Sequence, residues 1–189
     1  MYTYAVPQVD RVSFVSLVQT DVLHAEVVHT SQLRARVEQC LHSREPLAIV
    51  QAVSEYLPYL LGLYDCVLRD TILLRDDVHL TWHSMLVSSK FRLHGLLSEV
   101  CLMHMLYASS LRAEAATIVE ALGAYELGAH DRKACDDRLR VAIDLLCRAS
   151  GVCEYVATQL LPTSPAPPSK SAYPPELVSE GVQACSKLA

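Results

Sequence analysis

The sequence predicts an all-α protein in which any sheet is limited to a short hairpin at the N-terminus. Apolar residues recur at three- and four-residue steps across much of residues 20–160, which is the period of an amphipathic helix. The run from Leu96 to Leu106 is apolar nearly all round, as is typical of a helix in the middle of a domain. A chain of 189 residues is long enough to bury such a helix in a core of its own.

The N-terminal residues 1–19 are expected to form an extended lead-in, because they combine β-branched and aromatic residues with one proline. A first helix is predicted from Thr20 to about His42, where apolar residues follow one another mostly at four-residue steps. Pro46 suits the first position of a second helix, and Pro58 is expected to kink or interrupt that helix. Residues 79–89 form a short mixed segment with the only tryptophan.

Residues 91–127 are predicted to be the most strongly helical part, ended by Gly123 and Gly128. Asp136 and Asp137 are expected in the first turn of the next helix, where the helix dipole favours acids. One face of that helix is expected to carry Leu139, Ala142, Ile143, Leu146, Ala149, Cys153 and Val156. Residues 161–176 are predicted to be a Pro-rich loop, and a last helix starts near Pro174 or Pro175.

Composition excludes several classes of protein. A formal charge of -5 with interspersed basic residues argues against nucleic-acid binding, which needs an excess of Lys and Arg on one face. No stretch reaches the ~18 uncharged apolar residues of a transmembrane helix. The N-terminus lacks the features of a secretory signal, and seven scattered cysteines without any C-x-x-C predict reduced thiols. We therefore expect a cytoplasmic protein.

No catalytic or metal centre is predicted. His79 and His83 have a spacing that can hold zinc, but the segment lacks the glutamate of H-E-x-x-H and an obvious third ligand. Cys147 and Cys153 are six residues apart, so on a helix they point ~120° away from each other, a poor geometry for chelation. The glycine-rich phosphate and dinucleotide motifs and the hydrolase elbow are missing. We expect neither an enzyme nor a bound cofactor.

Several segments together resemble the first half of the BRO1 domain. They are YLPYLLGL (56–63), HLTWHS (79–84), the helix of residues 91–116, RASGVCEYV (148–156) and PPELVSEGVQACSKLA (174–189). Ser98 and Cys153 stand where the family usually has an aromatic residue. The likeness covers about residues 45–189 and is closest to plant-type, endosomal-targeting BRO1-like proteins. It implies a partial BRO1-like domain over residues 20–189, whose TPR-like second half is expected beyond Ala189, so that the chain is truncated.

The resemblance also implies a function. BRO1 domains are curved helical scaffolds without a catalytic centre. In relatives, a concave apolar patch with nearby acids binds the amphipathic C-terminal helix of an ESCRT-III (charged-multivesicular-body) subunit. Asp136, Asp137, Leu139 and Ile143 are expected to lie where relatives contribute part of this patch; the alternative is that these residues only cap and pack their helix. We therefore expect an adaptor in endosomal sorting that can associate with the endosomal membrane peripherally. The alternative function is a helical-repeat interaction module with an unrelated partner.

Overall fold

The computed structural model describes residues 9, 12–19, 23–84, 86–123, 132–163 and 173–188. Over these residues the chain is mainly helical, with one small hairpin, which confirms the predicted fold class. The helices are α1 (His24–Ser43), α2 (Pro46–Leu68), α3 (Leu96–Gly123), α4 (Arg132–Tyr155) and α5 (Ser179–Leu188). The strands are β1 (His79–His83) and β2 (Lys90–His94), and short 3-10 turns include Phe14–Ser16 and Pro175–Leu177.

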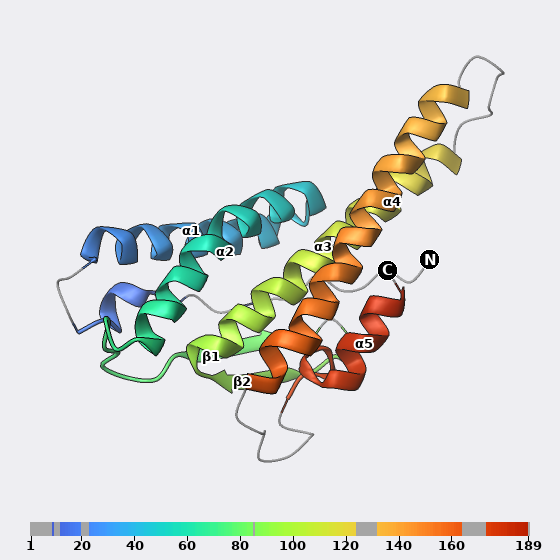
Figure 1. Ribbon diagram of the computed structural model, residues 1–189. Coiled ribbons are helices and arrows are strands. Elements are labelled where there is room, and N and C mark those ends of the chain that lie inside the picture. Colours follow the sequence, from blue (N-terminus) through green and yellow to red (C-terminus); the bar gives the residue numbers. More distant parts are fainter. Residues whose placement is uncertain are drawn as a thin grey trace.

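The helices pack in chain order, α1 on α2, α2 on α3, α3 on α4 and α4 on α5. α3 and α4 form a long antiparallel pair whose far end projects beyond the other helices (Figure 1). α5 lies against the opposite half of α4, near the hairpin (Figure 1). The start of α4 therefore has α3 beside it, whereas the end of α4 is enclosed by several elements.

α3 is the central helix of the core, as its all-round apolar sequence predicts. Val100, Met103 and Leu106 have no exposed surface, and nearly all residues from 96 to 106 are buried. The N-terminal segment joins the same core through Phe14, which is fully buried. Burial of each large apolar side chain stabilises the fold by roughly 1.5–3 kcal/mol, so this helix anchors the elements around it.

The hairpin lies in the middle of the chain and not at the N-terminus as we expected. β1 and β2 pair antiparallel with Trp82 opposite Phe91, in a stretch that we had assigned to a mixed segment and to the start of a long helix. Leu93 is buried, whereas its neighbours Arg92 and His94 are exposed, so β2 alternates with the period of a strand. Val9 of the lead-in forms an isolated bridge with Trp82, so part of the N-terminal segment is extended beside this hairpin.

α2 continues through Pro58, so of the kink or interruption that we expected, the interruption does not occur. Pro58 deprives the carbonyl oxygen of Ser54 of its helical donor, and because Ser54 and Pro58 are both exposed, water can replace that donor. α2 is also long and apolar enough, by length and composition, to cross a membrane. Its buried residues Val53, Tyr56 and Leu60 belong to the core that it shares with α1 and α3, and core helices of folded proteins often meet the same criteria.

Two buried carboxylates join distant parts of the fold. Glu99 of α3 pairs with Arg34 of α1 at 2.5 Å and accepts a hydrogen bond from the Tyr56 hydroxyl of α2. Glu176, just before α5, accepts hydrogen bonds from Trp82 Nε1 at 2.6 Å and from the Ser84 hydroxyl at 2.8 Å. All three ionic side chains are almost completely buried, so each carboxylate depends on these partners for its solvation.

Candidate protein-interaction surface

The residues that the sequence singled out lie on the projecting half of α4. Leu139 is 41% exposed and Ile143 is 59% exposed, and both aspartates are exposed as well. The shared face that we predicted is divided in burial, since its members Ala142, Ala149 and Cys153 are buried and these two residues are not. Leu139 and Ile143 are exposed because this part of α4 packs on α3 and extends past α5 (Figure 1).

The two aspartates do not occupy the first turn of α4. The helix begins at Arg132, one turn earlier than we expected, and its first turn contains no acidic residue. Asp136 and Asp137 therefore lie in the second turn, where the interaction of an acid with the helix dipole is already weak. Interaction with the helix dipole therefore stabilises these two acids only weakly and does not explain their position.

Helical geometry brings three of the four predicted residues together and separates the fourth. Successive residues are rotated by about 100°, so Leu139 and Ile143 point about 40° apart and Asp136 lies within about 60° of both. Asp137 points at least about 120° away from the two apolar side chains. It also pairs with Arg140 at 3.6 Å, whereas Asp136 makes no ion pair within the part of the chain that the structure describes.

We call Asp136, Leu139 and Ile143 the α4 flank. It continues a side of α4 that α5 covers farther along, because Ser150 is seven residues after Ile143 and its hydroxyl contacts that of Ser186 at 3.0 Å. The flank thus presents two exposed apolar side chains and an unpaired carboxylate on one surface. Such a surface can bind an amphipathic helix that carries apolar residues and a basic residue.

Val141 is exposed to a similar extent, at 53%, but lies on the other side of α4. It points about 160° away from Ile143, on the same side of the helix as Asp137. Sequence analysis missed Val141 because it belongs to no periodic apolar face. The residue provides a matched control for the α4 flank, since both positions are exposed aliphatic residues on the same turns of one helix.

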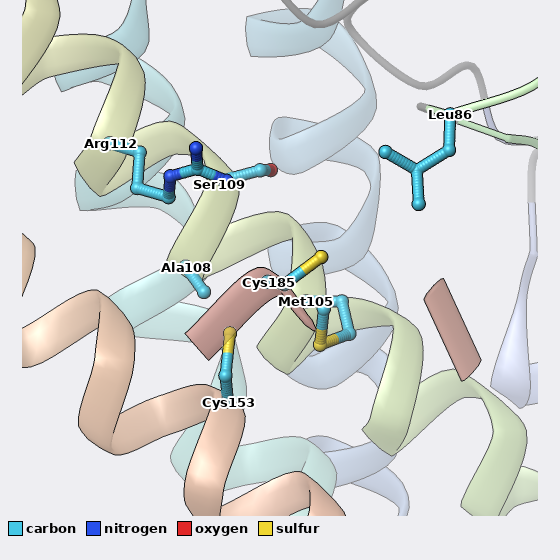
Figure 2. A pocket seen from close by; sticks show the side chains of 7 residues that line it. All are labelled: Leu86, Met105, Ala108, Ser109, Arg112, Cys153 and Cys185. Carbon is cyan, nitrogen blue, oxygen red and sulfur yellow. The ribbon is translucent and has the colours of Figure 1, made fainter. Parts of the chain in front are cut away.

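Cys147 and Cys153 lie in different environments. Cys147 is exposed, whereas Cys153 is buried and lines a cavity of about 20 Å³ together with Cys185, Met105 and Arg112. Figure 2 shows side chains of α3, α4, α5 and the hairpin loop meeting at this cavity, which is large enough for about one water molecule. Burial raises the pKa of Cys153 to about 11 and also raises that of Cys185, so both thiols stay protonated at neutral pH and are poor nucleophiles.

The histidine pair that the sequence suggested is not the one that the fold forms. His79 lies across the hairpin from His94, with their Nδ1 atoms 2.8 Å apart, and His83 pairs with Lys90 instead. Asp77 approaches His94 at 3.9 Å. Among the described residues, no group of three or more His, Cys, Asp or Glu side chains could hold a metal ion.

Comparison with known proteins gives one distant relative. The chain is 28% identical over 181 residues to the pH-response regulator protein palC of Cryptococcus neoformans var. neoformans serotype D (strain B-3501A). The match covers 82% of this chain and 37% of palC, so the chain spans little more than a third of the length of this relative. No protein-family model matches the chain. The similarity is compatible with the resemblance to the BRO1 domain.

Proposed function

We propose that this chain is a non-enzymatic, BRO1-type adaptor in endosomal protein sorting, and that its α4 flank binds an amphipathic helix of an ESCRT-III subunit. The observation that carries the proposal is the exposure of Leu139 and Ile143 beside the unpaired Asp136 on a projecting helix. The helical fold, the segments that resemble the BRO1 domain and the similarity to a pH-response regulator support it. An adaptor with this role works at the cytoplasmic side of the endosome.

The proposed contact combines apolar burial with one charge pair. Apolar residues of the ligand helix, three or four positions apart, cover Leu139 and Ile143, and a Lys or Arg of the ligand pairs with Asp136. Asp136 is better placed for this than Asp137, which points away and already has Arg140 as its partner. The resemblance implies that in BRO1 domains the second half of the domain contributes the rest of the patch, so binding by residues 1–189 alone is expected to be weak.

The experiment is a titration of the 189-residue chain with the C-terminal helix of an ESCRT-III subunit, followed by NMR, which detects weak binding. Ile143→Asp should weaken binding at least ten-fold, because a charge then faces the apolar side of the ligand. Val141→Asp is the matched control and should leave binding unchanged. Asp136→Ala should weaken binding about two- to five-fold, as expected for an exposed charge pair, and Asp137→Ala should have less effect. Equal losses from Ile143→Asp and Val141→Asp would contradict the placement of the site.

A second candidate function is a helical interaction module with a partner outside ESCRT-III. It is favoured by the absence of a matching family model and by a relative named for pH response. We also propose that, within the BRO1 family, the chain is closest to the plant-type, endosomal-targeting proteins, because it shares the YLP segment and the Pro-Pro-Glu helix start. If ESCRT-III helices do not bind at about 1 mM, where the binding free energy is only about −4 kcal/mol, the second candidate replaces the first.

A further inference from the structure

A second hollow lies between α1 and α2, away from the α4 flank. It has a volume of about 200 Å³ and is lined mainly by apolar side chains. Val27, Leu63 and Ile72 form its buried walls. Leu23 and Tyr59 also line it and are 37% and 43% exposed, so they lie toward the solvent. An apolar cavity of roughly 150 Å³ holds a benzene molecule, so this hollow can take one large apolar side chain.

Gly62 helps to keep this hollow open. It lies within α2 and lines the hollow, and a Cβ atom placed on it would meet no other atom within 4 Å. A helix interior normally disfavours glycine by about 0.5–1 kcal/mol relative to alanine, so helix formation does not explain this residue. A larger side chain at position 62 would extend into open space and could fill the hollow without displacing the backbone.

Among the described residues that line the hollow, the acidic group is a single carboxylate, and Thr30 adds a buried hydroxyl that donates to the Glu26 carbonyl oxygen. Glu26 lines the hollow and makes no ion pair with any residue that the structure describes. The exposed ring of Tyr59, which His29 contacts edge-on with ring centroids 4.6 Å apart, offers a second surface that attracts cations. Leu23 has a φ of 61°, a left-handed backbone conformation that is strained for leucine, and such strain is concentrated at binding sites.

From these features we infer that the hollow is a second docking site, which binds a peptide segment of a partner protein through one large apolar side chain and an adjacent Lys or Arg. The apolar side chain enters between α1 and α2, and the basic group reaches Glu26 and Tyr59. The volume of the hollow, its mainly apolar lining and the Glu26 carboxylate together favour this class of ligand over an acidic or purely polar peptide. The inference does not depend on the α4 flank, so the chain would connect two partners at once.

The test uses a display library of 12-residue peptides selected on the 189-residue chain. Enriched peptides should share a Leu, Phe, Met or Trp with Lys or Arg within about one helical turn. Gly62→Leu should weaken their binding at least ten-fold. Gly151→Leu is the matched control, because Gly151 is also an exposed glycine within a helix, has nothing within 4 Å of its Cβ position and lies on α4; it should have no effect. Glu26→Gln should weaken binding about two- to five-fold.

Several results would overturn the inference. They are the absence of enriched peptides, peptides without basic residues, and peptides whose binding Gly62→Leu leaves intact. Sedimentation of the unliganded chain distinguishes another occupant, since a loss of self-association caused by Gly62→Leu would assign the hollow to a second copy of the chain. Circular dichroism checks the fold of each variant, and Glu26→Lys at an exposed position gives an independent test in case Gly62→Leu fails to fold.

Discussion

Trp82 Nε1 donates a hydrogen bond of 2.6 Å to the carboxylate of Glu176, 94 residues later in the chain. Trp82 lies in β1 and Glu176 in the turn before α5, and both are fully buried. The two residues come from the HLTWHS and PPELVSEG segments, which are among those that resemble the BRO1 domain. The structure thus gives these segments a shared physical role, since one holds the other in place.

Removal of the Glu176 carboxylate should release this contact. Glu176→Ala leaves the buried Trp82 N–H without that acceptor, and we expect a loss of about 1–3 kcal/mol in the free energy of unfolding. Urea denaturation measures the loss, and hydrogen exchange should show faster exchange in residues 173–188. Glu154→Ala, at an exposed position of α4, serves as the control and should change the stability by less than about 0.5 kcal/mol. A similar effect of both substitutions would refute the role of Glu176.

The close approach of α5 to the preceding turn gives a second prediction. A Cβ atom on Gly181 would lie 1.8 Å from the carbonyl oxygen of Pro175, which is backbone and cannot turn aside. Gly181→Ala should therefore lower the free energy of unfolding by about 1–3 kcal/mol, although alanine favours helices. Gly151→Ala, where the Cβ meets no atom within 4 Å, should raise it by about 0.5–1 kcal/mol. Thermal melts of both variants measure these changes in stability. Stabilisation by Gly181→Ala would disprove the close approach of Gly181 to the Pro175 carbonyl oxygen.

The buried ion pair of Glu99 should contribute far more than an exposed one. Glu99→Ala leaves the Arg34 charge buried without this partner and is expected to cost about 3–5 kcal/mol. Arg36 of α1 and Glu55 of α2 form an exposed ion pair, so Glu55→Ala should cost less than about 1 kcal/mol. Urea denaturation of the two variants under the same conditions compares them, and equal costs would contradict the burial of Glu99.

Sequence analysis predicted the helices better than their ends or partners. The apolar period located α1, α2, α3 and α4 because it records burial. It could not show that α4 extends past α5, and so it grouped the exposed Leu139 and Ile143 on one face with the buried Ala149 and Cys153. The strand of residues 90–94 was missed because its alternation spans only five residues next to a strong helix. The partners of Glu99 and Glu176 are far away in the chain and leave no local signal.

The stability of the protein should fall at mildly acidic pH because of His104. Burial lowers the pKa of this histidine below its usual 6.5, although Nδ1 lies 2.7 Å from the Val100 carbonyl oxygen. The unfolded chain then binds a proton more readily than the folded chain, so this stability is complete above about pH 6.5 and is lost as the pH falls toward the lower folded value.

Unfolding by urea between pH 5 and 8 measures this dependence. His104→Gln should reduce its slope. The matched control is His42→Gln, because His42 Nδ1 lies 2.8 Å from the Glu38 carbonyl oxygen in the same i–4 geometry but at an exposed position. His42→Gln should leave the slope nearly unchanged. A slope that is the same in wild type and His104→Gln would show that other groups determine the pH dependence.

The central claim is that an ESCRT-III helix binds the α4 flank, and isoleucine methyl NMR tests it most directly. The chain has four isoleucines, at positions 49, 72, 118 and 143. Ile143 is 59% exposed on the flank, whereas Ile49 and Ile72 are 2% exposed elsewhere in the fold. On addition of the ESCRT-III C-terminal helix, the account predicts that the Ile143 methyl signal shifts progressively while those of Ile49 and Ile72 stay in place. A shift of Ile72 with Ile143 unchanged, or no shift at all, would contradict it.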